Sequence, residues 1–315
     1  MSKSAIITGV CGQDGSYLAE FLIKKGYEVT GIYRRSSQAH FDNLCEATRN
    51  KMSLVEGDIT DSGFVTKLIQ ERVPDEIYNL AAQSHVATSF KQPSLTFQVN
   101  LNGTLNLLEA IKQFSPQTKF YQASTSELFG KVKQSPQNEN TNFHPRSPYG
   151  VSKMAAHSLT INYRESYNIF ACCGILFNHE SPRRGDNFVT KSIAKQVAEI
   201  KKGKRDILTV GNVTAKRDWG YAPDYVEAMW MMLQNKTPQD YVIATGKTHS
   251  VKDFIDAAYD AAGIYNCGYE EDISLLRPAE VDYLCGDYTK AKTELGWSPT
   301  TTFSELVKKM VEFEL

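Results

Sequence analysis

The stretch Thr8–Leu22, TGVCGQDGSYLAEFL, joins an apolar run to an amphipathic one through a glycine-rich turn. The preceding residues 4–7 have the short apolar pattern of a buried strand, and residues 16–25 place apolar side chains at helical spacing. Such a turn lets backbone N–H groups approach a pyrophosphate at a helix N-terminus, where the helix dipole favours an anion. The order strand, turn, helix therefore predicts a dinucleotide-binding turn, made by Gly9, Val10, Cys11, Gly12, Gln13, Asp14 and Gly15.

Strands and helices alternate through the whole first half of the chain. Further strands are expected at residues 28–33, 52–56, 76–80, 119–122 and 169–176, and further helices at residues 99–114 and 149–167. Because parallel strands need long crossovers, this alternation predicts an α/β fold with a doubly wound parallel sheet, the Rossmann fold.

The pattern changes after Leu176. Residues 178–187 are rich in Pro, Gly, Arg and His and predict a functional loop, followed by helices at 188–202, 224–233, 250–262 and 303–313. Asp224 is expected to cap the second of these helices. We expect a dinucleotide-binding domain at residues 1–177, completed by parts of 211–246. Residues 178–315 are expected to form mainly a smaller mixed α/β substrate domain.

The residues after the second strand indicate which dinucleotide binds. An NAD site places Asp or Glu there to hold the ribose 2′-hydroxyl, whereas this chain has Arg34, Arg35, Ser36 and Ser37. Two guanidinium groups and two hydroxyls suit a 2′-phosphate, and no carboxylate repels it. The sequence therefore predicts NADP. The ends of the third and fourth strands are expected to meet the same cofactor, through Asp58, Ile59, Leu80, Ala81, Ala82, Gln83 and Ser84.

A second group of residues carries acid–base chemistry. Tyr149 and Lys153 lie four apart and share one helix face, so the lysine is expected to lower the pKa of the phenol. The fifth strand runs into Thr125 and Glu127 at the same sheet edge. Thr125 supplies a hydroxyl near Tyr149. Glu127 supplies a base that plain alcohol oxidation does not need, but that an elimination next to a new carbonyl does need.

Composition excludes several classes of protein. The formal net charge is −1, so no broad basic surface for nucleic acid or an anionic membrane is expected. The six cysteines form no Cys-x-x-Cys pair, and we expect reduced thiols, no metal site and a cytoplasmic location. Neither a leader peptide nor a membrane-spanning segment is expected.

Motifs across nearly the whole chain resemble the extended short-chain dehydrogenase/reductase family and, within it, the GDP-mannose 4,6-dehydratases. Besides the opening turn, they are GIYRRSS from Gly31, NLAAQSHV from Asn79, FYQASTSELFG from Phe120, PRSPYG from Pro145, GILFNHESPRRG from Gly174, AKRDWG from Ala215 and RPAEVD from Arg277. The Tyr and Lys occur throughout the superfamily, whereas the Thr-Ser-Glu triplet and the segments from Gly174 and Ala215 are more specific.

The resemblance implies residue roles. It makes Thr125, Glu127, Tyr149 and Lys153 catalytic, and adds Lys153, His179 and Arg184 to the NADP site. It also implies a homodimer or homotetramer. Residues expected to bind the GDP-sugar are Ser84, Ser126, Asn178, Lys191, Arg217, Arg277 and Glu280. The implied reaction moves a hydride through NADP from sugar C4 to C6, with loss of water, and forms GDP-4-keto-6-deoxymannose.

Three alternatives remain open. The same dehydration of GDP-D-glycero-D-manno-heptose is the nearest, because residues 263–276 look shorter than in longer relatives. A 4-ketohexose reductase or an epimerase does not need Glu127. A catalytically silent NADP-binding regulatory module does not need the four catalytic residues together. Cys11 also departs from the threonine usual in the family's turn.

Overall fold

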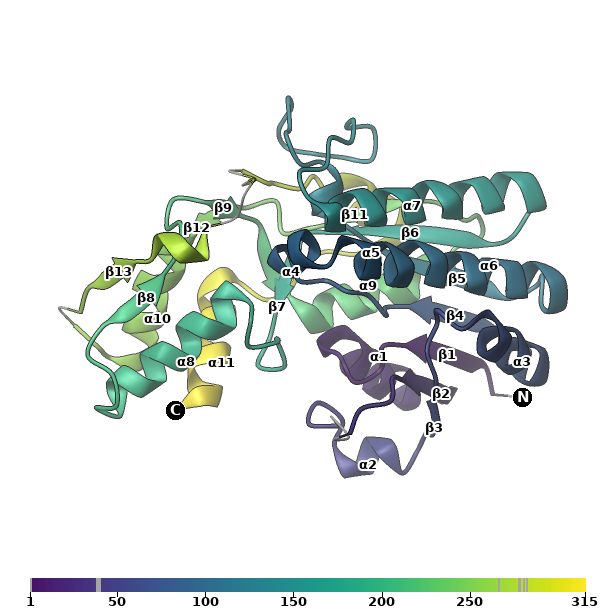
Figure 1. The fold of residues 1–315 in the computed structure, drawn as a ribbon, viewed down its shortest axis with the longest axis horizontal. Helices are drawn as coiled ribbons and strands as arrows, with labels where there is room; N and C mark the ends of the chain where they lie inside the picture. The colour runs from purple at the N-terminus through teal and green to yellow at the C-terminus, as the bar shows by residue number, and fades with distance from the viewer. Residues whose placement is uncertain (1, 38–40, 266, 277–278, 280, 282) are drawn as a thin grey trace.

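A seven-stranded parallel sheet forms the centre of the computed structural model, which describes residues 2–37, 41–265, 267–276, 279, 281 and 283–315 (Figure 1). From one edge to the other its strands are β11 (Tyr241–Ile243), β6 (Ala171–Leu176), β5 (Lys119–Thr125), β4 (Glu76–Asn79), β1 (Ser4–Thr8), β2 (Glu28–Tyr33) and β3 (Ser53–Glu56). Strands β2 and β3 follow β1 toward one edge of the sheet, whereas β4, β5 and β6 follow on the other side of β1. Ligands of doubly wound sheets bind at such a switch in strand order, here between β1 and β4. The predicted fold class is confirmed.

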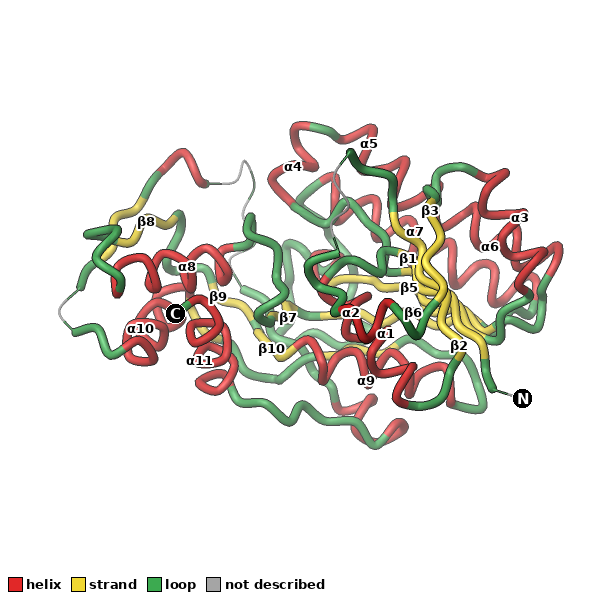
Figure 2. The backbone as a smooth tube through the Cα atoms, turned by 90° about the horizontal axis from the view of Figure 1, so that it is seen from below, coloured by secondary structure: helices red, strands yellow, loops and turns green. Residues whose placement is uncertain are grey.

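Helices cover both faces of the sheet (Figure 2). Ile7 packs toward the face covered by α1 (Gln13–Lys24) and α9 (Ala222–Gln234). Its neighbour Ile6 packs toward the other face, covered by α3 (Ser62–Arg72), α6 (Gly103–Phe114) and α7 (Pro148–Tyr167). Successive strand residues point to opposite faces, so a run of apolar residues is what a sheet buried on both sides requires.

Shorter elements complete this part of the chain. The expected helix at residues 99–114 is longer and irregular, because α5 (Pro93–Phe97), a π-helical turn (Gln98–Asn102) and α6 follow one another directly. Other short helices are α2 (Glu46–Arg49), α4 (Val86–Lys91), a 3₁₀ turn (Ser126–Leu128) and a π turn (Ala291–Leu295).

A second body lies beside the carboxyl edge of the sheet (Figure 1). Its core joins the apolar faces of α8 (Val189–Lys201), α10 (Val251–Ala262) and α11 (Phe303–Glu314). Short strand pairs accompany these helices. They are β8 (Leu208–Val210) with β13 (Tyr269–Glu271), β9 (Lys216–Arg217) with β12 (His249–Ser250), and β7 (Asn178–Glu180) with β10 (Trp219–Tyr221); a 3₁₀ turn covers Ile273–Leu275.

Two local predictions are wrong. Asp224 does not cap α9, because Pro223 stands in the first turn of a helix that begins at Ala222 and so places Asp224 inside it. Its carboxylate instead accepts hydrogen bonds from the backbone N–H groups of Thr300 and Thr301, both at 3.0 Å. The expected loop at residues 178–187 opens with strand β7, whose partner β10 lies about forty positions later, beyond the reach of local patterns.

The ion pair between Arg164 and Asp240 ties α7 to the start of β11. The side chains are only 16% and 14% exposed, and two N–O distances of 2.9 Å make the pair bidentate. The Cys173 N–H also donates to Asp240 at 2.8 Å. Burial favours the neutral acid, but Arg164 outweighs it and lowers the pKa of Asp240. Since the folded pKa lies below the unfolded value, this stabilisation is present above about pH 4 and is lost as the pH falls through the folded pKa.

Asp240→Asn is expected to lower the free energy of unfolding by about 3 kcal/mol in urea titrations at pH 7, because it leaves Arg164 buried without its counter-ion. Stability of the variant should also depend less on pH below about 5. The control Glu71→Gln breaks an exposed pair with Lys67 at 3.9 Å and should change stability by less than about 1 kcal/mol. Equal effects of the two changes would contradict this assignment.

Candidate active site

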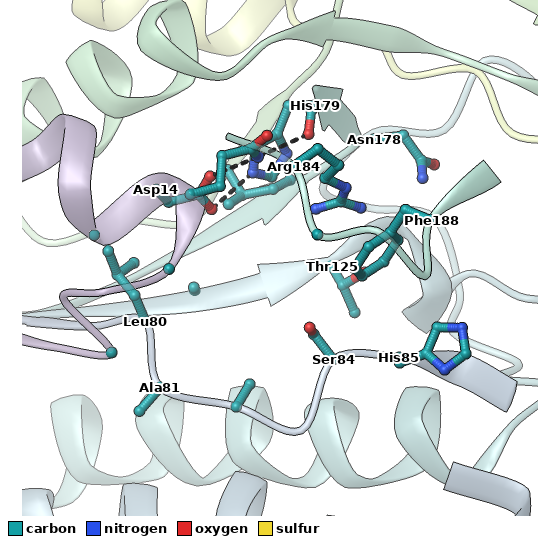
Figure 3. A pocket seen from close by; sticks show the side chains of 18 of the residues that line it. Asp14, Leu80, Ala81, Ser84, His85, Thr125, Asn178, His179, Arg184 and Phe188 are labelled. Atoms are coloured by element: carbon teal, nitrogen blue, oxygen red, sulfur yellow. Dashed lines mark hydrogen bonds and ion pairs between the residues drawn. The ribbon is translucent and has the colours of Figure 1, made fainter. Parts of the chain in front are cut away.

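A cavity of about 570 Å³ opens at the carboxyl ends of the strands. Figure 3 shows that its wall combines the start of α1, the segment after β4, the end of β5 and the segment after β6. It is lined by most of the residues predicted for the site: Gly9, Gly12, Gln13, Asp14, Gly15, Arg34, Asp58, Ile59, Leu80, Ala81, Ala82, Ser84, Thr125, Ser126, Glu127, Tyr149, Lys153, Asn178, His179, Arg184 and Arg217.

The floor of the cavity is the glycine turn. Gly9 has φ +67°, a left-handed conformation that favours glycine, and a Cβ there would lie 3.0 Å from the backbone of Ala81. A Cβ on Gly15 would lie 2.4 Å from the Gly9 carbonyl oxygen. Gly12 precedes the first residue of α1, whose unpaired N–H groups face an incoming ligand. This crowded backbone, set at a helix N-terminus, fits the pyrophosphate of a dinucleotide.

The catalytic candidates meet on one side of the cavity. Thr125 ends β5, Glu127 lies in the next turn, and Tyr149 and Lys153 stand one turn apart on α7; all four side chains are buried. Ser147 caps α7 by accepting from the Gly150 N–H at 3.0 Å. This cap fixes the start of the helix and places Tyr149 in its first turn, beside the end of β5.

The prediction that Lys153 lowers the pKa of Tyr149 is wrong for this structure. Burial raises the pKa of Tyr149 to about 12, and contact with the Thr125 hydroxyl only partly opposes it. Burial also lowers the pKa of Lys153 to about 8. In the described part of the chain, no side chain forms a hydrogen bond or ion pair with Lys153. Because both side chains are buried, each group is pushed toward its neutral form.

An ion-pair network holds the upper wall of the cavity. His179 lies 2.8 Å from Asp14 of α1, and Arg184 lies 3.0 Å from Glu180 (Figure 3). Arg183 reaches back to Glu20 on α1 at 2.7 Å. Burial favours the neutral form of His179, but the charge of Asp14 and its hydrogen bond to the imidazole together have the larger effect and raise the pKa of His179. Segments that are more than 150 positions apart in sequence therefore share one wall.

Comparison with known proteins identifies the family. The family model described as GDP-mannose 4,6 dehydratase matches residues 6–310. The chain belongs to the GDP-mannose 4,6-dehydratase family. A GDP-mannose 4,6 dehydratase from Homo sapiens is 50% identical to it, over 99% of this chain and 91% of the relative.

Solved structures agree on the fold of this family member. UDP-glucose 4-epimerase from Thermotoga maritima, solved with UDP-glucose, has a TM-score of 0.87 and 26% identity over 98% of both chains. RMD from Pseudomonas aeruginosa, complexed with NADPH, has a TM-score of 0.83 and 26% identity over 99% of both chains. One fold thus serves an epimerase and the dehydratase family, so the side chains in the cavity must distinguish the reactions.

Several predicted residues do not line the cavity. Lys191 is buried elsewhere, where its ammonium donates to the Pro182 carbonyl at 2.7 Å and pairs with Glu314. The Arg35 side chain is 85% exposed and lies 4.0 Å from Glu56. Val10, Cys11, Ser36, Ser37 and Gln83 also lie outside the lining. Arg277 and Glu280 lie outside the described residues.

Sequence reasoning missed other residues of this wall. His85 and Phe188 stack edge-to-face with ring centroids 5.8 Å apart, and the Arg184 guanidinium lies 3.5 Å above the Phe188 ring (Figure 3). Both rings line the cavity, as do Asn43 and Arg183. His85 follows Ser84 directly, and Arg183 precedes Arg184 in a segment already noted for its composition. Phe188, by contrast, had only the signal of an apolar helix start.

Among the residues that the structure describes, no group of three His, Cys, Asp or Glu side chains is placed to hold a metal ion. The six cysteines are free thiols. Over the same described ranges, no helix combines the length and apolarity needed to cross a bilayer.

Lys153 is expected to titrate near pH 8, because burial disfavours its charged form. NMR titration of the lysine side chains tests this, with Lys153→Met identifying the signal. Lys252 serves as the internal comparison, since its exposed ammonium bonds Asp256 and its pKa is raised. A Lys153 midpoint at or above that of Lys252 would refute the effect of burial.

Proposed function

We propose that this chain converts GDP-mannose to GDP-4-keto-6-deoxymannose and water, with NADP as its cofactor. The observation that carries the proposal is the buried cluster of Thr125, Glu127, Tyr149 and Lys153 in a cavity floored by a dinucleotide-type turn. Full-length similarity to GDP-mannose 4,6 dehydratases supports the same reaction. A 4-epimerase removes no proton from C5, so its reaction does not need a buried carboxylate base such as Glu127.

The choice of NADP rests on the residues after β2. Arg34 lines the cavity, and Arg35, Ser36 and Ser37 follow it on the exposed side of the same segment. A guanidinium at this place suits a 2′-phosphate. RMD, which shares the fold and binds NADPH, supports this choice.

The side chains divide the reaction between them. Tyr149 accepts the proton of the C4 hydroxyl as that carbon becomes a ketone, and Thr125 holds the phenol oxygen in place. The ketone acidifies the hydrogen at C5, which Glu127 removes as a proton. The C6 hydroxyl then leaves as water, taking that proton from the Glu127 carboxyl, and C5 receives the proton that Tyr149 took from the C4 hydroxyl. When bound, NADP⁺ would supply the hydride chemistry, in which the hydride leaves C4 and returns at C6, and the positive charge of the oxidised ring would favour the phenolate of Tyr149.

The GDP-sugar is placed by the remaining wall. Ser84, Ser126, Asn178 and Arg217 line the cavity and offer hydroxyl, amide and guanidinium donors. Roles for Lys191, Arg277 and Glu280 stay predictions, and Lys191 would have to exchange its present partners to reach the diphosphate. The heptose alternative also stays open, because it shares every chemical step with the hexose.

We also propose a cytoplasmic location, a division into two domains and an oligomeric state. Free thiols are compatible with a reducing cytoplasm. Residues 1–177 with parts of 211–246 would form the cofactor domain, and residues 178–315 mainly the substrate domain; β11 and α9 packing on the sheet supports this division. A homodimer or homotetramer is proposed from the family resemblance.

Turnover decides the substrate. Purified protein is incubated separately with GDP-mannose and with GDP-D-glycero-D-manno-heptose, with and without added NADP⁺, and analysed by mass spectrometry. We expect GDP-mannose to lose one water. Loss from the heptose alone would move the substrate but keep the chemistry. No loss from either sugar with NADP⁺ present would sink the proposed reaction.

Glu127→Gln keeps the shape of the side chain but removes its basicity, so dehydration should slow by roughly 100-fold or more while NADP binding persists. Glu165→Gln provides a matched control, because Glu165 is exposed on α7 and should tolerate the change. Dehydration that survives in the Glu127 variant would show that another group is the base.

Arg34→Ala should weaken NADP binding by about 10- to 100-fold, because it removes a charged hydrogen-bond partner of the 2′-phosphate, and should affect NAD far less. Calorimetric titration with both dinucleotides measures the difference. Arg72→Ala, an exposed arginine at the end of α3, serves as the control. Equal losses for NADP and NAD would rule out the 2′-phosphate contact.

A further inference from the structure

The contact between Asp14 and His179 has a feature that simple packing does not require. Asp14 lies in the first turn of α1, and His179 lies beside it in β7 (Figure 3). The imidazole Nε2 is 2.8 Å from Asp14 Oδ2, and its Nδ1 is 2.8 Å from the Phe177 carbonyl oxygen. Both ring nitrogens therefore face oxygens.

Donor and acceptor chemistry sets the number of protons in this contact. A carbonyl oxygen only accepts, so Nδ1 must carry a hydrogen. An ionised carboxylate also only accepts, so a neutral imidazole would direct its Nε2 lone pair at a negative oxygen. The 2.8 Å contact thus needs one proton between Nε2 and Oδ2. With that proton the pair has no net charge; without it the pair carries a charge of −1.

Neighbouring groups hold the two residues in this orientation. The Gln13 amide donates to Asp14 Oδ1 and to the His179 carbonyl oxygen, both at 3.0 Å. Its own oxygen accepts from the Ser181 hydroxyl at 2.8 Å, which fixes the orientation of the amide. The Tyr225 ring stacks on the imidazole with centroids 4.7 Å apart. The contact is therefore built, rather than a chance approach of two mobile side chains.

Both arginines near the pair have carboxylate partners. Arg184 pairs with Glu180, and Arg183 pairs with Glu20. Other titratable groups facing the pair are Lys153 and Tyr149 from α7, Tyr121 from β5 and Tyr225 from α9. Burial opposes both charges, yet the pKa of Asp14 is lowered and that of His179 is raised, as expected for an ion pair. Loss of the proton would add a negative charge at the N-terminus of α1.

We propose that Asp14 and His179 form a proton-dependent clasp that positions the cofactor-binding turn, so that the chain binds the pyrophosphate of NADP tightly only while the clasp holds its proton. The clasp ties α1 to β7 and also cancels the Asp14 charge where an anion must bind. His179 is then a positioning residue. The consequence for NADP rests on the proposed function, whereas the protonation state does not.

The protonation state is measured first, by ¹⁵N NMR titration of the imidazoles in the purified protein. His179 should titrate above the ordinary value of about 6.5, and Asp14→Asn should abolish the rise. Buried His157 is the internal comparison, since burial lowers its pKa. A His179 that is neutral throughout, or that titrates with His157, would overturn the clasp.

The second measurement is the dissociation constant of NADP⁺ between pH 7 and 10, by calorimetry. Over this range the 2′-phosphate stays fully ionised. The wild type should lose affinity by about tenfold as the clasp loses its proton. Asp14→Asn should show a flatter profile, because the new amide can donate to a neutral Nε2 and still accept from Gln13. Lys153 also titrates in this range and faces Asp14, so both profiles are measured again in the Lys153→Met background, where its contribution is absent.

Glu20→Gln is the matched control. Like Asp14→Asn, it removes a carboxylate from α1 and an ion pair that joins α1 to the segment after β6, in this case the pair with Arg183. Glu20, however, lies away from the N-terminus of α1. It should retain the wild-type pH profile. Identical profiles for Asp14→Asn and the wild type would refute the clasp's role in binding. If no variant binds NADP⁺ at pH 7, the proposed cofactor is wrong, and the NMR titration alone still decides whether the clasp holds a proton.

Discussion

Close backbone packing where β1 meets α1 and β4 is the constraint on which the rest of the structure depends. The Thr8 hydroxyl accepts from the backbone N–H groups of Leu80 and Ala81, at 3.0 and 2.9 Å, and donates to Asn79 at 2.7 Å. These bonds hold the ends of two strands together. Only glycine fits at positions 9 and 15 in the space that remains. The cavity floor, the start of α1 and the opening between the two strands all follow from this arrangement.

Burial is the second constraint, and it acts on the chemistry. Tyr149 and Lys153 are both buried, so the neutral form of each is favoured in the free protein. A phenol with a pKa near 12 is a poor base at neutral pH unless a positive charge lies beside it. Under the proposed mechanism, burial would therefore link the reactivity of Tyr149 to the presence of a cationic ring in the cavity.

The sequence predicted the elements that depend on local patterns. The order of strands and helices around the sheet followed from short apolar runs and glycine turns, and strand β2 has the expected bounds. Prediction failed where a distant partner decides the outcome. Strand β7 needs β10, and Asp224 binds a loop more than seventy positions away. His179 was predicted by resemblance, but its pairing with Asp14, which lies far away in the sequence, had no local signal. Patterns indicated which residues could carry chemistry, but gave no measure of burial, so the predicted direction of the Tyr149 pKa was wrong.

The order of strands at one edge of the sheet affects how the chain is made. Strand β6 (ACCGIL) is buried at every residue. Its outer neighbour in the sheet, β11, comes later in the chain, after β7, α8, β8, β9, β10 and α9. During synthesis, β6 is therefore an unprotected edge strand until residues 241–243 leave the ribosome. Apolar edges of this kind pair readily with other chains. The sheet thus stays open at this edge until β11 has been made and pairs with β6.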